Sequence, residues 1–248
     1  MKVVGIIPVR MAASRFPGKP LALIHGRPMV EHVFRRAWMS KTMSEVVVAT
    51  CDEAIQKVVE GFGGAATMTA DTHVRATDRI AEASWKLDAD VVVNVQGDEP
   101  MLRPEMLDLL CAPLLEDPTL PCSNLMMAID DETDFRDPNQ VKVVCNQRQE
   151  ALYMSREPIP TTYYLGSEVP KWKQLGLVAF TKEFLLTLAQ LPPTPLERAE
   201  SVDMMRAIEH GYRVKMVASP YLTYAVDTPE DLARVEKMMA HDELLTQY

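Results

Sequence analysis

The sequence predicts an α/β fold with a mostly parallel, doubly wound sheet and a smaller β-rich portion. Three short runs of apolar, largely β-branched residues lie at 3–9, 45–51 and 89–96. Runs that are apolar on both faces are typical of buried parallel strands. Segments with a 3.6-residue apolar period alternate with these runs. Alternating strands and helices indicate crossover connections that place helices against a parallel sheet.

The helical segments of the N-terminal half follow these strands in order. The apolar period predicts helices over 28–40, 52–62 and 76–87. Gly63-Gly64 marks the end of the second helix, because glycine commonly ends helices.

The pattern changes after Pro100. A helix is predicted over 103–116, and three strand-like runs follow, separated by polar turns such as 130–139; the runs are 122–129, 140–145 and 150–155. Consecutive strands without intervening helices predict an antiparallel or mixed portion, at about 118–180.

The remainder of the chain returns to alternating elements. The segment 157–173 is rich in proline and aromatic residues and predicts a long loop. The elements predicted after it are a strand over 175–180, a helix over 193–211, a strand over 213–219 and a final helix over 228–245. We find no repeat and no linker, so we expect a single domain spanning 1–248.

Composition excludes several classes of protein. The 248 residues are 47% hydrophobic and 25% charged, as in an ordinary globular protein, and the net charge of −9 argues against a general nucleic-acid binder. The N-terminus lacks the pattern of a signal peptide and no run reaches the ~18 apolar residues of a membrane span, so we expect a cytoplasmic protein. The four cysteines show no CxxC pair and are expected to be buried thiols.

Charged residues follow several of the predicted strands. Arg10, Arg15 and Lys19 come after the first strand, and Asp98 follows the strand at 89–96. Asp227 lies in the C-terminal segment YAVDTPEDL. Ligands of open α/β sheets bind beyond the carboxyl ends of the strands, so these groups are expected to share one crevice. Cations together with carboxylates suit a polyphosphate bound with Mg²⁺.

Each of these signals also has a simpler interpretation. The alternatives are solvated loop charges for the three cations, an ordinary turn residue for Asp98, and part of a helix start for Asp227, with Thr228 as the N-cap. The chain has neither a Walker motif nor a GxGxxG fingerprint, which disfavours a P-loop enzyme and a dinucleotide-dependent oxidoreductase.

Several motifs taken together resemble the sugar-acid cytidylyltransferases, and most of all those that act on 3-deoxy-manno-octulosonate (Kdo). These motifs cover nearly the whole chain in order and include PVRMAASRFPGKPL, MTADTHVRATDRIAE, VVNVQGDEPML, YMSREPIP and VDTPEDLARV. The resemblance implies a Rossmann-like nucleotidyltransferase fold and Mg²⁺-assisted, in-line transfer of CMP from CTP to an acidic acceptor, with release of pyrophosphate. It also implies a homodimer and a place in lipopolysaccharide biosynthesis.

The resemblance also implies roles for individual residues. Arg10, Arg15 and Lys19 would contact the CTP phosphates, and Asp98 and Asp227 would bind Mg²⁺; of these five, all but Arg15 are expected to be catalytic. The other residues expected to bind substrates are Pro8, Val9, Arg79 and Gln96 for the base and ribose, and Arg156, Gln174 and Glu197 for the acceptor. His73 is expected to be a structural or hydrogen-bonding residue rather than a catalytic base.

The departures from the family pattern gather on the acceptor side. His73-Val74-Arg75-Ala76-Thr77 stands where Kdo enzymes usually read His-Gln-Ser-Gly-Thr, and Gln174 stands in place of a histidine. Two hydroxyl-bearing tyrosines are also replaced, by Val178 and Phe180. Because losing hydrogen-bonding groups changes substrate choice, two acceptors stay open: Kdo itself, or another acid such as 8-amino-Kdo, a different sugar acid or a phosphonate. A catalytically silent nucleotide-binding homologue is a further alternative.

Overall fold

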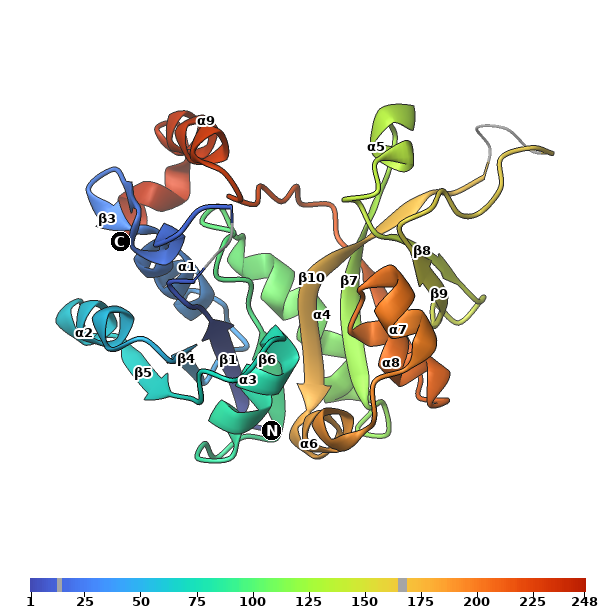
Figure 1. The fold of residues 1–248 in the computed structure, drawn as a ribbon, viewed down its shortest axis with the longest axis horizontal. Coiled ribbons are helices and arrows are strands. Elements are labelled where there is room, and N and C mark those ends of the chain that lie inside the picture. The colour runs from blue at the N-terminus through green and yellow to red at the C-terminus, as the bar shows by residue number, and fades with distance from the viewer. Residues whose placement is uncertain (13–14, 165–168) are drawn as a thin grey trace. The chain divides into compact units, whose positions relative to one another are not determined.

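The computed structural model describes residues 1–12, 15–164 and 169–248, and it contains two compact units. Unit 1 comprises Met1–Asp108 and Thr223–Tyr248, and unit 2 comprises Leu109–Leu222 (Figure 1). The helix α4 (Pro104–Glu116) runs across the boundary between them in the sequence. The β-rich portion predicted at about 118–180 falls within unit 2, and the expected single domain over 1–248 stays a prediction.

Unit 1 is built on four parallel strands in the order β6-β1-β4-β5. Their bounds are β1 Val3–Pro8, β4 Glu45–Thr50, β5 Ala65–Met68 and β6 Val91–Asn94. The valines and isoleucines of β1, β4 and β6 are at most 2% exposed, as expected for strands covered on both faces. Parallel pairing places the carboxyl ends of β1, β4 and β6 along one edge, where the loops that carry Arg10, Asp52 and Asp98 begin.

Helices of unit 1 follow the predicted order. They are α1 (Met29–Trp38), α2 (Glu53–Gly61), α3 (Ala76–Ser84) and α9 (Pro229–Met239), with short 3₁₀ turns η1 (Lys19–Leu21) and η3 (Glu243–Gln247) and a small hairpin of β2 (Leu23–Ile24) and β3 (Arg27–Pro28). Side chains from α9 and the preceding segment pack with those of the hairpin and α1 in one buried cluster of Ile24, Met29, Val226, Val235 and Met239. This packing brings the C-terminal Asp227 beside the N-terminal loop.

Unit 2 contains a mixed sheet. Its strands are β7 (Cys122–Ala128), β8 (Lys142–Cys145), β9 (Ala151–Ser155), β10 (Trp172–Thr181) and β11 (Val214–Ala218). β7 pairs parallel with β11 and antiparallel with β10, and β8 pairs antiparallel with both β9 and β10. The helices after α4 are α5 (Glu132–Arg136), α6 (Lys182–Gln190), α7 (Pro195–Glu200) and α8 (Met204–Glu209). The predicted mixed portion is thus confirmed.

The α/β fold is confirmed, and several element predictions need correction. The helix predicted over 193–211 is two helices, because Ser201 adopts a left-handed conformation (φ 53°) that ends α7. The final helix ends at Met239 rather than at 245, and α5 occupies part of the expected turn at 130–139. Residues 165–168 of the predicted loop 157–173, and residues 13–14 of the loop after the first strand, lie outside the described residues.

The structure also bears on the expected burial of the cysteines and on membrane-spanning segments. All four cysteines are free thiols; Cys111 and Cys122 are buried, whereas Cys51 and Cys145 are only half-buried. Among the described residues, every helix is too short or too polar to cross a lipid bilayer.

Candidate active site

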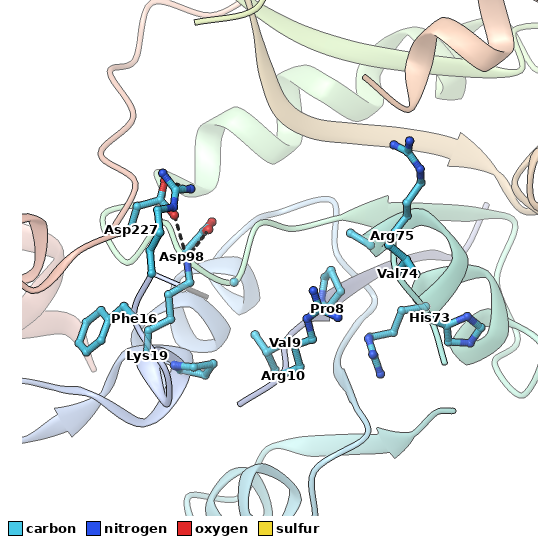
Figure 2. Close-up of a pocket in the computed structure, with 15 residues that line it drawn as sticks. Pro8, Val9, Arg10, Phe16, Lys19, His73, Val74, Arg75, Asp98 and Asp227 are labelled. Atoms are coloured by element: carbon cyan, nitrogen blue, oxygen red, sulfur yellow. Dashed lines mark hydrogen bonds and ion pairs between the residues drawn. The ribbon is translucent and has the colours of Figure 1, made fainter. Parts of the chain in front are cut away.

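A pocket of about 320 Å³ lies within unit 1. Its walls come from the end of β1 and the loop after it, the loop after β6, the segment that leads into α3 and the first turn of that helix, and Asp227, two residues before α9. Figure 2 shows Asp98, Asp227 and Lys19 on one side of the pocket and His73, Val74 and Arg75 on the other, with Pro8 and Val9 between them. The lining also includes Arg10, Arg15, Phe16, Pro20, Ala76, Arg79 and Gly97.

The ammonium group of Lys19 joins the two aspartates. Lys19 Nζ lies 2.8 Å from Asp98 Oδ2 and 3.2 Å from Asp227 Oδ1, and it also donates to the Val226 carbonyl at 3.0 Å. Arg15 Nη2 lies 3.0 Å from the other carboxylate oxygen of Asp227. Two carboxylates and two cations therefore form one cluster, although the sequence separates Lys19 from Asp98 by 79 residues and from Asp227 by 208.

The two aspartates keep the ammonium group of Lys19 protonated. Burial by itself would lower the pKa of Lys19, but the attraction and hydrogen bonds of Asp98 and Asp227 outweigh burial and raise it above the ordinary value of 10.5. Lys19 is therefore fully protonated near neutral pH.

The two aspartates suit a divalent metal bound together with phosphate. Mg²⁺ in nucleotide sites commonly takes one or two carboxylates, with phosphate oxygens and water completing its coordination. Asp98 and Asp227 share one ammonium group as a common partner, so their oxygens already face a single point. Within the described residues no cluster of three or more His, Cys, Asp or Glu side chains is placed to hold a metal by protein ligands alone. The donor set thus fits a metal whose remaining ligands come from a substrate.

Close packing shapes the wall beside Asp98. A Cβ atom at Gly97 would lie 2.3 Å from Val9 Cγ1 and 3.2 Å from the Pro8 carbonyl oxygen. A side chain at this position would therefore force Val9, directly after β1, to shift. Pro8 and Val9 line the pocket next to Gly97 and Asp98.

Arg79 offers an unused donor at the pocket wall. Arg79 is 3% exposed, and its Nη1 donates to Thr69 Oγ1 and to the Ala70 carbonyl. Nη2 is buried and has no hydrogen-bond acceptor among the described residues. A buried unpaired donor in a pocket wall is a feature that a bound polar ligand would satisfy.

The structure does not place every predicted site residue in this pocket. Pro8, Val9, Arg10, Arg15, Lys19, Arg79, Asp98 and Asp227 line it, whereas Gln96 is half-buried and is not among its lining residues. Arg156, Gln174 and Glu197 belong to unit 2.

The three residues of unit 2 differ in their surroundings. Arg156 donates to the backbone carbonyls of Glu200 and Pro138, and Gln174 donates through Nε2 to Asn124 Oδ1 at 2.9 Å. Glu197 is fully buried, and its carboxylate receives two hydrogen bonds from Arg206, at 2.6 and 2.8 Å. This pairing favours a structural role for Glu197.

Sequence reasoning left several pocket and loop residues without a role. Phe16 lines the pocket, and Asp52 accepts a hydrogen bond from the Met11 N–H at 2.8 Å, which ties the cation-bearing loop to the end of β4. Glu82 pairs with His73. For Asp52 and Glu82 no motif spacing pointed to these contacts, because each depends on how a loop folds back.

Comparison with known proteins shows the family of this chain. The cytidylyltransferase family model matches residues 4–216. A 3-deoxy-manno-octulosonate cytidylyltransferase from Syntrophotalea carbinolica is 44% identical over 95% of this chain and 98% of its own. The namesake enzyme from Geobacter metallireducens is 41% identical over 98% of this chain and 100% of its own.

Solved structures extend the likeness to three dimensions. A CMP:2-keto-3-deoxy-manno-octonic acid synthetase complexed with CTP superposes with a TM-score of 0.93 at 40% identity, covering 97% of this chain and 99% of the other. A 4-diphosphocytidyl-2C-methyl-D-erythritol synthase from Anaerococcus prevotii, 15% identical with a TM-score of 0.63 over 97% and 99% of the two chains, shares the fold alone. The chain therefore belongs to the cytidylyltransferase family.

Proposed function

We propose that this protein transfers CMP from CTP to a Kdo-like sugar acid and releases pyrophosphate. The observation that carries the proposal is the gathering of Arg10, Arg15, Lys19, Asp98 and Asp227 around one pocket in a chain of this family. Relatives more than 40% identical over nearly their whole length bear the name of this activity, which supports the same chemistry here.

The chemistry needs no nucleophile from the protein. An oxygen of the acceptor attacks the α-phosphorus of CTP, the bond to the bridging oxygen breaks, and pyrophosphate leaves in line with the attack. The protein contributes alignment of the two substrates and neutralisation of the charge on the triphosphate. A pocket lined by cations and carboxylates is suited to both tasks.

We assign the donor side of the reaction to residues of unit 1. Arg10, Arg15 and Lys19 bind the phosphates; for Arg15 and Lys19 this means exchanging their carboxylate partners for phosphate oxygens. The backbone of Pro8 and Val9 meets the base. Arg79 and Gln96 hold the base and ribose. The unpaired Nη2 of Arg79, a donor without an acceptor, supports this assignment for Arg79.

Asp98 and Asp227 are the residues that would hold Mg²⁺. The ion, when bound, neutralises negative charge on the phosphates and on the attacking oxygen. The proposal that these two aspartates bind it rests on their shared position at Lys19 Nζ and on the chemistry of their oxygens.

The acceptor side is assigned to unit 2. Arg156 would face the acid group of the acceptor, and Gln174 and Glu197 would complete its site. Because Glu197 is buried and paired with Arg206, its role would be to support the site rather than to contact the acceptor. A second candidate acceptor, an acid other than Kdo, is favoured by Gln174. Its amide is fixed by Asn124, so this position offers different hydrogen bonds from the histidine of Kdo enzymes.

A pyrophosphate-release screen tests the proposal. The purified protein is supplied with CTP, Mg²⁺ and, one at a time, Kdo, 8-amino-Kdo, sialic acid and a phosphonate. Turnover with Kdo supports the main proposal, and turnover with another acid alone supports the second. CTP binding without turnover of any acid would instead indicate the silent homologue, and failure to bind CTP would refute all three.

The proposal includes a homodimer in the cytoplasm. The location follows from the donor, because CTP is a cytoplasmic nucleotide. Sedimentation equilibrium measures the oligomeric state, and a monomer at micromolar concentration would contradict this part.

A further inference from the structure

Two side chains of α3 reach back to the segment that precedes it. Arg79 donates to Thr69 Oγ1 and to the Ala70 carbonyl, and Glu82, one turn further along the helix, accepts the Ala70 N–H at 2.9 Å. The same oxygen of Glu82, Oε2, also accepts from His73 Nε2. Side chains of α3 therefore bind the segment 69–73 in both senses: Arg79 donates hydrogen bonds to it, and Glu82 accepts hydrogen bonds from it.

Glu82 lies outside the pocket, whereas His73 lines it (Figure 2). The side chain of Glu82 is 38% exposed and that of His73 is 22% exposed. The hydrogen bond from the Ala70 N–H, with that from His73, holds the pKa of Glu82 below its usual value of 4.5, although its modest burial acts in the other direction. Glu82 is therefore an ionised carboxylate at neutral pH.

An ionised carboxylate determines which nitrogen of His73 carries a proton. Because a carboxylate only accepts hydrogen bonds, the ring nitrogen that faces it, Nε2, must be the donor. The contact thus sets both the tautomer of the imidazole and the orientation of its ring. His73 begins the segment His73-Val74-Arg75-Ala76, all four residues of which line the pocket.

We propose that Glu82 is a positioning residue for CTP binding, which acts by fixing His73 and thereby the pocket wall formed by residues 73–76. The proposal rests on the proposed function, in which CTP occupies this pocket. Without Glu82, the wall must be ordered when the nucleotide binds, and the loss appears as weaker CTP binding.

Because one oxygen of Glu82 accepts both hydrogen bonds, two substitutions of Glu82 distinguish the loss of these bonds from the loss of charge. Glu82→Ala removes the one oxygen that accepts both hydrogen bonds. It is expected to raise the KM and the Kd for CTP about threefold to tenfold, the effect of having to order one or two side chains on binding, with kcat within twofold of wild type. Glu82→Gln keeps one carbonyl oxygen that can accept from both donors, so it is expected to restore most of the affinity. Glu60→Ala is the matched control, because Glu60 also accepts one side-chain hydrogen bond on a helix surface, from Gln56, and lies outside the pocket.

A double-mutant cycle tests whether Glu82 acts through His73. If it does, Glu82→Ala combined with His73→Ala binds CTP no more weakly than His73→Ala alone. Nitrogen-15 NMR of the imidazoles gives a readout independent of activity: the His73 signals, assigned with His73→Ala, show Nε2 protonated in the wild type and lose that preference in Glu82→Ala.

The outcomes separate this proposal from the proposed function. A wild-type protein that does not bind CTP refutes the proposed function itself. If the wild type binds CTP, then unchanged affinity in Glu82→Ala, additive effects in the cycle, or an unchanged His73 tautomer each overturn the positioning role. Equal losses in Glu82→Gln and Glu82→Ala would also overturn it, because they would point to the charge of Glu82 rather than to its hydrogen bonds.

Discussion

Replacing either aspartate beside Lys19 by asparagine separates catalysis from stability. Asp98→Asn and Asp227→Asn keep the shape of the side chain and remove its charge. In Asp98→Asn, Lys19 Nζ retains Asp227 at 3.2 Å and the Val226 carbonyl at 3.0 Å, so the cluster keeps an ion pair and a hydrogen bond. In Asp227→Asn, Lys19 retains Asp98 at 2.8 Å.

The expected change in stability is small. The carboxylates are 28% and 36% exposed, and ion pairs with this access to solvent contribute about 1 kcal/mol or less to the free energy of unfolding. Removing one of two neighbouring negative charges also relieves repulsion between Asp98 and Asp227. We therefore expect each variant to unfold within about 1 kcal/mol of wild type.

The expected change in turnover is large. Each variant loses one of the two carboxylates proposed to hold Mg²⁺, and loss of one group that stabilises transition-state charge typically lowers kcat about 100- to 1000-fold. The Mg²⁺ concentration needed for half-maximal rate should rise as well, because an amide is a weaker ligand than a carboxylate.

Pyrophosphate release at varied Mg²⁺, together with urea unfolding, measures both effects. Asp90→Asn is the matched control, since Asp90 accepts the Lys2 N–H at 2.6 Å and is not part of the pocket lining. Turnover near the wild-type level in Asp98→Asn or Asp227→Asn would remove that residue from the proposed metal site. Loss of turnover accompanied by several kcal/mol of destabilisation would show that the aspartates serve folding instead.

Three further predictions concern packing and pH. Gly97→Ala, whose Cβ would lie 2.3 Å from Val9 Cγ1, should lower the free energy of unfolding by about 1–3 kcal/mol and raise the KM for CTP, as urea unfolding and steady-state kinetics will show. Lys142 is fully buried and donates to three backbone carbonyls, so Lys142→Met should destabilise unit 2 by about 2–4 kcal/mol; an unchanged urea midpoint would contradict this. Burial alone would raise the pKa of Glu200, but hydrogen bonds, among them that of the Arg156 N–H, lower it below 4.5. Its stabilising contribution is therefore present above pH 4.5 and is lost as the pH falls through the folded-state pKa, so Glu200→Gln should flatten the acid side of a stability–pH curve.

The strands of the core could be predicted because their signal is local. β1, β4 and β6 are runs of valine and isoleucine, which are typical of strands buried on both faces. β5 reads Ala-Ala-Thr-Met, is only partly buried and lies at the sheet edge, so its composition indicates no strand. It forms because its backbone pairs with β4, which is a tertiary contact.

Helix ends likewise divide into those set by neighbouring residues, which could be predicted, and those that could not. The start of α9 could be predicted, because Thr228 is followed by Pro229 at the first helical position and by Asp231 at the third. The structure contains the capping box that Thr228 and Asp231 form. The break between α7 and α8 could not, because nothing in the local pattern announces the left-handed Ser201.

The sequence by itself determined the α/β class, the order of the core elements and the motifs of a cytidylyltransferase, since these depend on composition and on spacing along the chain. Only the tertiary structure decided that Lys19 lies between Asp98 and Asp227, and that Glu82 holds His73. These contacts join residues through the parallel sheet, the packing of α9 on the N-terminal hairpin and a folded-back loop. Their energies depend on distance and burial, which sequence separation does not specify.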